Sequence, residues 1–182
     1  DRSTHAGKWE KNRFMGVELY GKVLGVIGCG NIGAIVCDRA IGLKMRVVAY
    51  DPYLTEERAV DLGVERVELD ELLARADFIT LHTPLNDATR GIINAENITK
   101  MKTGVRIVNC ARGGLLVEED LRAAIDTGQV AGAAVDVFSS EPAKENALFG
   151  CEKVVATPHL GASTDEAQVN VAVQVAEQMS DY

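Results

Sequence analysis

Short apolar runs rich in β-branched residues alternate with segments of helical periodicity along most of the chain. This alternation predicts a parallel sheet joined by helices, because parallel neighbours need a long crossover between them. We therefore expect an α/β fold, a doubly wound parallel sheet with helices on both faces. The predicted strands are Lys22–Gly28, Arg46–Asp51, Phe78–Thr83, Val105–Cys110, Gly132–Phe138 and Val154–Thr157, with a shorter one near Val64–Val67.

Start and stop signals locate the helices between these strands. The best-defined helices are expected near Asn31, near Thr55, at Val117 and after Ser163-Thr164, and three acidic residues after Val117 complement the positive end of a helix. Glycines should form left-handed caps where helices or loops pass into strands. They are Gly21, Gly63, Gly104 and Gly128. A further helix is expected over residues 8–14, with Trp9 and Phe14 packed on a neighbour.

Composition limits the class of protein and its partners. The 182 residues, 47% of them hydrophobic, fit one domain over residues 1–182 that can bury a core. A net charge of -8 disfavours nucleic acid and membrane surfaces, because both are anionic. The chain has no apolar run long enough to span a bilayer, and it opens Asp1-Arg2-Ser3 with no apolar leader. We therefore expect a cytoplasmic protein.

The cysteines and histidines do not have the spacing of a metal site. The four cysteines lack CxxC spacing and lie in apolar or helical stretches, so we expect buried free thiols of a reducing compartment. They are Cys29, Cys37, Cys110 and Cys151. The three histidines are not spaced as ligands with them, so we predict that no metal is bound. They are His5, which we expect to be exposed, His82, which lies inside a predicted strand, and His159.

A glycine-rich turn follows the first predicted strand. It reads Gly28-Cys29-Gly30-Asn31-Ile32-Gly33 and leads directly into a helical pattern. Gly28 permits a tight turn, Gly30 lets the backbone approach a pyrophosphate, and Gly33 lets helix and strand pack closely. The free N–H groups at the helix start can receive the phosphate charge. Such a run alone is often a flexible turn, but between a strand and a helix it predicts a Rossmann dinucleotide-binding fold.

An acidic residue at the end of the next predicted strand selects the cofactor. Asp51 lies 18 residues beyond Gly33, near the position of a carboxylate that binds the adenosine ribose. Placing that carboxylate about 4 Å from a 2′-phosphate would cost roughly 1 to 4 kcal/mol. We therefore predict NAD rather than NADP. The alternative role for Asp51 is an acidic turn before Pro52.

Three later strand ends carry a cation, a carboxylate and an imidazole. Arg112, Glu141 and His159 follow successive predicted strands, so we expect them in the crevice that also holds the glycine turn. Oxidation of a 2-hydroxy acid by hydride transfer needs these groups. His159 would take the hydroxyl proton, Glu141 would fix its tautomer, and Arg112 would hold the substrate carboxylate. Taken singly, Arg112, Glu141 and His159 could instead be a surface cation, a loop acid and a capping or core polar histidine. His82 is expected to be a hydrogen-bonded structural or cofactor-lining residue.

At these motifs the chain resembles the D-2-hydroxyacid dehydrogenases. The resemblance runs from residues 8–10 through 28–33, 82–85, 109–114 and 136–138 to 158–164, and the last segment is especially similar to the branch acting on 3-phosphoglycerate. The resemblance implies that Arg112, Glu141 and His159 are the catalytic residues, and that the phosphorylated 2-hydroxy acid is oxidised in serine biosynthesis. It also implies a cofactor lining of Asn31, Ile32, Asp51, Thr83, Cys110, Ala111, Arg112, Asp136, His159 and Ala162.

The resemblance also bears on domain organisation and assembly. Members of this family place a substrate lobe before the cofactor domain, and some carry a C-terminal regulatory domain. We expect residues 1–182 to lack both, and hence to bind NAD with little or no turnover by themselves. A homo-oligomer is implied for the full-length protein. Two other functions remain open: a related dehydrogenase acting on glycerate, lactate or hydroxypyruvate, and a non-catalytic NAD sensor similar to corepressors.

Overall fold

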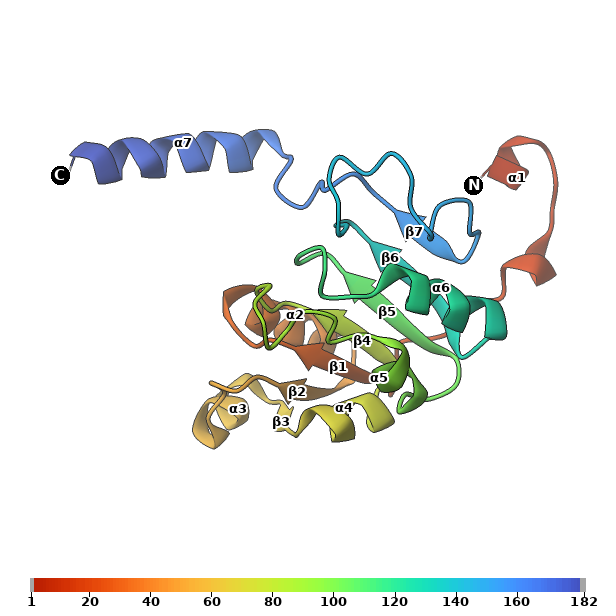
Figure 1. Ribbon diagram of the computed structural model, residues 1–182, viewed down its shortest axis with the longest axis horizontal. Helices are drawn as coiled ribbons and strands as arrows, with labels where there is room; N and C mark the ends of the chain where they lie inside the picture. Colours follow the sequence, from red (N-terminus) through yellow and green to blue (C-terminus); the bar gives the residue numbers. More distant parts are fainter. Residues whose placement is uncertain (1, 181–182) are drawn as a thin grey trace.

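The computed structural model describes residues 2–180, and its centre is one parallel sheet of seven strands (Figure 1). The strand order is β3-β2-β1-β4-β5-β6-β7, so the chain crosses from one side of β1 to the other between β3 and β4. The carboxyl ends of all seven strands therefore meet at one edge of the sheet. The strands are β1 (Val23–Ile27), β2 (Arg46–Tyr50), β3 (Glu65–Arg66), β4 (Phe78–Leu81), β5 (Val105–Asn109), β6 (Val130–Val135) and β7 (Val154–Ala156).

The helices begin where the sequence signals predict. Thr55 caps α3 by accepting a hydrogen bond of 3.2 Å from the Arg58 backbone N–H, and α6 begins directly after Val117. The four predicted cap glycines all have positive φ angles, from 68° to 84°. The helices are α1 (Arg2–His5), the 3-10 turn η1 (Lys11–Phe14), α2 (Asn31–Gly42), α3 (Glu56–Leu62), α4 (Leu69–Arg75), α5 (Ala95–Thr99), α6 (Glu118–Thr127) and α7 (Asp165–Ser180).

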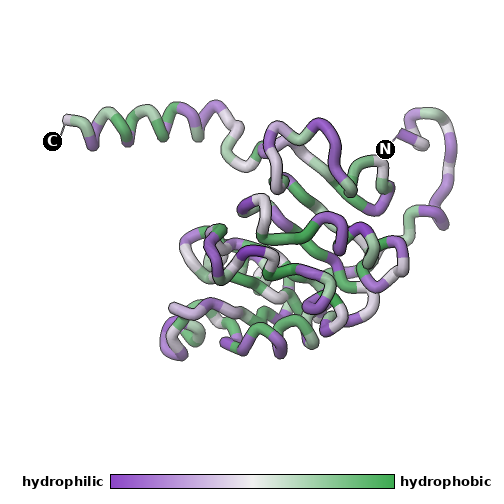
Figure 2. The backbone as a smooth tube through the Cα atoms, viewed as in Figure 1, coloured by the Kyte–Doolittle hydropathy of each residue, from purple (hydrophilic) through white to green (hydrophobic). Residues whose placement is uncertain are grey.

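Two apolar clusters lie on opposite faces of the sheet, which confirms the doubly wound arrangement. Side chains alternate along β1, so Val23 and Ile27 join the larger cluster while Leu24 and Val26 join the smaller. The larger cluster includes residues of α4, α5 and α6, and the smaller includes residues of α2 and α3. Figure 2 shows apolar residues along these strands. Burial decreases towards β7, where Val155 is 65% exposed.

The predicted strands all end earlier than the sequence pattern indicated, and β4 and β6 differ most. β4 ends at Leu81 and β6 ends at Val135, so the predicted strand residues 82–83 and 136–138 belong to loops. The apolar pattern continues past the end of β6 because Val137 and Phe138 are buried although they lie outside the strand. The backbone N–H of Phe138 bonds to a side chain, the carboxylate of Glu141, in place of a neighbouring strand. These early ends place the polar residues on loops above the sheet.

The two ends of the described chain extend away from the sheet (Figure 1). The expected helix over residues 8–14 is wrong: only the 3-10 turn η1 forms there, and Trp9 and Phe14 are 87% and 59% exposed. Their side chains lack a packing partner in residues 2–180 that would bury them. Helix α7 has no buried residue. Among the helices of residues 2–180, none has the length and apolar character needed to cross a bilayer.

Candidate active site

The glycine turn between β1 and α2 is built as the motif predicts. A Cβ atom on Gly33 would lie 2.0 Å from the carbonyl oxygen of Gly28, so only glycine lets helix and strand approach this closely. Gly28 has a φ of 96°, and a Cβ there would meet the His82 carbonyl at 2.7 Å. Gly30, by contrast, faces open space with nothing within 4 Å. The turn is therefore closely packed at Gly28 and Gly33 and accessible at Gly30. This arrangement fits a pyrophosphate bound over Gly30 and the start of α2.

The first turn of α2 leaves its donors available. Gly30 is the N-cap residue and provides no side-chain hydrogen bond to the helix. Asn31 and Ile32, both predicted to line the cofactor, are exposed on this turn, and Ile32 is 67% exposed. Free N–H groups beside an accessible apolar side chain suit a phosphate with an adjoining ring or sugar.

Asp51 lies just beyond β2 with its carboxylate fixed by two backbone donors. Its Oδ2 accepts from the Cys29 N–H at 2.7 Å and its Oδ1 accepts from the Tyr53 N–H at 2.8 Å. The first bond ties Asp51 directly to the glycine turn. The carboxylate oxygens retain lone pairs for a ribose diol, so the acidic residue and the turn form one rigid unit.

The residues after β4 close the other side of the glycine turn. A Cβ on Gly28 would lie 2.8 Å from the backbone nitrogen of Thr83, so Thr83 is in direct contact with the turn. The ring Nε2 of His82 is 3.0 Å from the Thr80 hydroxyl, and burial lowers the pKa of His82. His82 is thus hydrogen-bonded within the structure and adjoins the glycine turn.

A buried carboxylate after β6 organises the segment that carries His159. Asp136 accepts from the Thr157 hydroxyl at 2.6 Å and from the backbone N–H groups of Leu160 and Gly161 at 2.8 and 2.9 Å. Burial alone would raise the pKa of Asp136, but these hydrogen bonds and the nearby His159 hold the pKa below its ordinary value. Asp136 is therefore a carboxylate that binds the backbone around His159.

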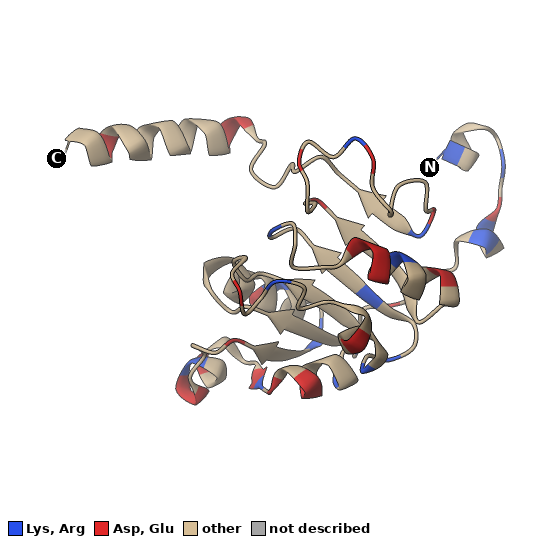
Figure 3. Cartoon of the chain, in the orientation of Figure 1, with Lys and Arg blue, Asp and Glu red and all other residues tan. Residues whose placement is uncertain are grey.

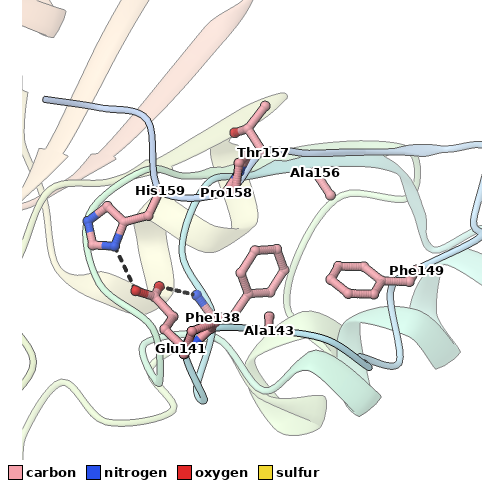
Figure 4. A pocket seen from close by; sticks show the side chains of 9 residues that line it. Phe138, Glu141, Ala143, Phe149, Ala156, Thr157, Pro158 and His159 are labelled. Atoms are coloured by element: carbon pink, nitrogen blue, oxygen red, sulfur yellow. Dashed lines mark hydrogen bonds and ion pairs between the residues drawn. The ribbon is translucent and has the colours of Figure 1, made fainter. Parts of the chain in front are cut away.

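His159 and Glu141 form a pair at the rim of the crevice (Figure 4). The His159 Nδ1 lies 2.7 Å from Glu141 Oε2, while Glu141 Oε1 accepts from the Phe138 N–H at 2.9 Å. The hydrogen bond to His159, followed by that from Phe138, lowers the pKa of Glu141. His159 has a φ of 56°, an uncommon conformation for a residue with a side chain. This geometry leaves Nε2 for another partner.

Arg112 lies on a loop shaped by the last residue of β5. The buried Asn109 side chain accepts from the Ala111 N–H at 3.1 Å and donates to the Arg112 carbonyl at 3.0 Å. A Cβ on Gly113 would lie 1.7 Å from the Phe138 carbonyl, so this loop packs tightly on the loop after β6. The exposed Arg112 guanidinium donates to the Ala111 carbonyl, and the hydrogen bonds among residues 2–180 do not join it to His159 or Glu141.

The exposure of the other predicted residues varies. Ala162 is exposed beside the Asp136-bound backbone, and Ala111 is half-buried on the Arg112 loop. Cys110 is exposed, which corrects the expectation that every cysteine is buried: it follows β5 at the open edge of the sheet. Only Cys37 is fully buried, while Cys29 and Cys151 are half-buried. All four are free thiols in the structure.

An apolar hollow of about 520 Å³ adjoins the pair. Phe138 and Phe149 meet edge to face in its wall, with ring centroids 5.4 Å apart, and His159 and Glu141 form its polar side (Figure 4).

Charged side chains are dispersed over the described elements in the view of Figure 3, and acidic residues gather at the start of α6.

Three residues that hold the loops in place were not predicted from the sequence. Asn109 shapes the Arg112 loop, Thr157 bonds Asp136, and the buried Glu118 accepts from both the backbone N–H and the hydroxyl of Ser139 at 2.8 and 2.7 Å. Glu118 was expected only as an acid at a helix start. A polar residue adjoining an apolar run was the available signal for Asn109 and Thr157.

The chain is similar to dehydrogenases from several organisms. It is 51% identical to the D-3-phosphoglycerate dehydrogenase of Synechocystis sp. over 181 residues, and 51% identical over 178 residues to that of Methanocaldococcus jannaschii. These matches cover 100% and 97% of this chain but 33% and 34% of the relatives, so the chain spans about one third of their length.

Solved structures show the same fold. A glyoxylate reductase from Paecilomyes thermophila matches with a TM-score of 0.90 and 36% identity, covering 98% of this chain and 54% of that one. The apo D-lactate dehydrogenase of Escherichia coli matches with a TM-score of 0.88 and 32% identity, covering 99% and 56%. The model of the D-isomer specific 2-hydroxyacid dehydrogenase NAD-binding domain matches residues 1–161. The glycine turn, Asp51 and this match agree: the chain belongs to the D-isomer specific 2-hydroxyacid dehydrogenase family, as its NAD-binding domain.

Proposed function

We propose that this chain is the cofactor domain of an enzyme that oxidises 3-phosphoglycerate to 3-phosphohydroxypyruvate. The observation that carries the proposal is the 2.7 Å contact between His159 Nδ1 and Glu141 Oε2, on the sheet edge that also holds the glycine turn. A base oriented by a carboxylate next to a dinucleotide site suits removal of a hydroxyl proton during hydride transfer.

The bound NAD would accept the hydride, and the protein's residues would handle the proton and the charges. With its Nδ1–H donated to Glu141, neutral His159 presents the Nε2 lone pair. Nε2 takes the proton of the C2 hydroxyl as hydride leaves C2. The Glu141 carboxylate stabilises the resulting imidazolium, and in the reverse reaction His159 returns the proton.

Arg112 is proposed as the cation for the substrate carboxylate. It is exposed on a loop after β5, the strand next but one to the strand that precedes His159. Its single bond to the Ala111 carbonyl leaves further N–H donors for a paired interaction with a carboxylate. We propose Asn31, Ile32, Asp51, Thr83, Cys110, Ala111, Asp136 and Ala162 as cofactor-lining residues, with the glycines of the turn.

The choice of substrate is supported by relatives. Both 51% identical relatives are named D-3-phosphoglycerate dehydrogenase, whereas the similar solved structures include a glyoxylate reductase and a D-lactate dehydrogenase. The matched relatives are about three times as long as this chain, so we propose that substrate contacts also come from a separate lobe. A homo-oligomer and a role in serine biosynthesis in the cytoplasm stay predictions.

The test is steady-state kinetics of the full-length protein with NAD and a panel of D-2-hydroxy acids. We expect the highest kcat/KM with 3-phosphoglycerate, and loss of most turnover in a His159→Ala variant. A preference for glycerate or lactate would assign another member of the family. A protein that retains its function in that variant would instead be a sensor of NAD.

A further inference from the structure

The function proposed above does not use a pair of thiols beside the glycine turn. The Sγ atoms of Cys29 and Cys37 lie 3.9 Å apart. Cys29 is the residue between Gly28 and Gly30, and Cys37 lies on the face of α2 that packs against the sheet. They are the one pair of sulfurs in hydrogen-bond contact within residues 2–180. The pair is therefore placed where a change in its chemistry would reach the dinucleotide site.

The two thiols differ in accessibility and acidity. Cys29 is half-buried, whereas Cys37 is fully buried in the smaller apolar cluster. The hydrogen bond between them lowers the pKa of Cys29, and the same bond, together with burial, raises the pKa of Cys37. Cys29 is thus the sulfur that an oxidant can reach and the one that more readily ionises. Thiolate character and exposure together favour oxidation.

Closing the pair into a disulfide needs a movement of the glycine turn. A disulfide bond is about 2.05 Å long, so the sulfurs must approach by nearly 2 Å. Cys37 is held inside α2 with no exposed surface, so most of the movement falls on Cys29. The Cys29 backbone N–H bonds to Asp51 Oδ2 at 2.7 Å. A shift of Cys29 therefore disturbs the carboxylate placed for the ribose.

We propose that Cys29 and Cys37 form a reversible disulfide that weakens NAD binding. The oxidant is a hydroperoxide, for which hydrogen peroxide is the probe. The Cys29 thiolate attacks one peroxide oxygen, breaks the O–O bond, and becomes a sulfenic acid as water leaves. The Cys37 sulfur then attacks the Cys29 sulfur, and a second water carries away the sulfenic oxygen. In sum, two thiols lose two electrons and two protons, and one peroxide becomes two waters.

Bound cofactor should in turn oppose the oxidation. If the disulfide weakens NAD binding, then by linkage NAD must disfavour the disulfide by the same factor. The proposal uses only the NAD-binding property of the family, so it can fail while the proposed substrate and catalytic residues remain correct, and the reverse also holds.

The first measurement locates the bond. The reduced protein is treated with hydrogen peroxide, remaining thiols are alkylated, and peptides are mapped by mass spectrometry. We expect one peptide that carries both cysteines, because residues 30–36 contain no Lys or Arg, with Cys29 linked to Cys37 and neither thiol alkylated. The linkage should form more slowly when NADH is saturating. Absence of this linked peptide would overturn the proposal.

The second measurement is NADH affinity, followed by fluorescence before and after oxidation. We expect about tenfold weaker binding in the oxidised protein, the size of one lost charge-assisted hydrogen bond, and recovery with dithiothreitol. Cys37→Ala and Cys29→Ser should each abolish the response to peroxide, and Cys151→Ser should retain it. Using both variants of the pair guards against misfolding of either one. An unchanged NADH affinity in the disulfide form, or a response that persists in both variants, would contradict the inference.

Discussion

Asp136 holds the backbone that follows His159: its two carboxylate oxygens accept hydrogen bonds from the N–H groups of Leu160 and Gly161. A third bond joins it to Thr157, two residues before His159. The imidazole therefore sits in a loop fixed on both sides by one buried carboxylate. This bonding stabilises the left-handed conformation of His159, which has a φ of 56°.

Replacing Asp136 with Ala should separate His159 from its working position. We expect turnover of the full-length enzyme to fall about a hundredfold, because misplacement of a catalytic group by 1 Å can cost that much. The three lost hydrogen bonds should lower the free energy of unfolding by about 1 to 3 kcal/mol. Steady-state kinetics and urea unfolding measure the two effects. Thr157→Val removes one of the three bonds and should give a smaller loss of each kind.

The same carboxylate should make the stability of the fold depend on pH. The folded-state pKa of Asp136 is lowered, so its contribution is present above its unfolded value of about 3.9 and is lost as the pH falls through the lower, folded value. Urea unfolding from neutral to acidic pH should show this decline. In Asp136→Asn the contribution is missing at neutral pH, and the slope in the acid range should be smaller. Equal slopes for both proteins would contradict the assignment.

Replacing Glu141 with Gln should affect chemistry more than binding. The amide keeps the shape of the side chain in contact with His159 but loses the charge that we propose stabilises the protonated imidazole. We expect kcat for 3-phosphoglycerate to fall about tenfold to a hundredfold, a fraction of the usual contribution of acid–base catalysis. NADH affinity should be retained, as checked by fluorescence titration. A parallel loss of NADH affinity would indicate a role in the cofactor site instead.

Two glycines of the same turn should respond differently to Ala. In Gly33→Ala the new Cβ would lie 2.0 Å from the Gly28 carbonyl oxygen, so we expect the free energy of unfolding to fall by about 1 to 3 kcal/mol. In Gly30→Ala the Cβ meets open space, so stability should change by less than about 1 kcal/mol. NADH binding should nevertheless weaken in Gly30→Ala, because the methyl group occupies the approach to the pyrophosphate. Thermal unfolding and NADH titration of both variants test this contrast.

The charge of Asp51 should set the preference for NADH over NADPH. Asp51→Asn keeps an acceptor for the Cys29 N–H but removes the charge that repels a 2′-phosphate. We expect the affinity ratio to shift towards NADPH by roughly 1 to 4 kcal/mol, the Coulomb energy estimated for the two charges. Calorimetry with both cofactors measures the ratio. The prediction fails if the ratio is the same as in the unchanged protein.

Local sequence patterns predicted the parts of the molecule that depend on local structure. The glycine turn, Asp51 and the helix starts follow from spacing and capping, and the parallel sheet follows from alternating periodicity. The strand ends were predicted less well, because the buried Val137 and Phe138 continue the apolar pattern into a loop. In that case burial, not strand pairing, produced the pattern.

Interactions between residues distant in the chain could not be predicted from the sequence. Glu118 and Ser139 are separated by 21 positions, and Asp136 and Gly161 by 25, so no local pattern marks their hydrogen bonds. Trp9 was expected to be packed because large aromatic side chains are usually buried, yet it is 87% exposed. The exposure of Cys110 likewise depends on where β5 ends at the sheet edge.

The strand order also limits the size of what can bind. Asp51 follows β2 and His159 follows β7, and five strand steps separate them in the sheet. At about 4.8 Å a step, the ends of these two strands lie roughly 24 Å apart along the edge. A single nucleotide can therefore touch one of these residues but never both. Only a long ligand, such as a dinucleotide with a substrate at its far end, can contact both residues. The width of the sheet therefore selects ligands by their length.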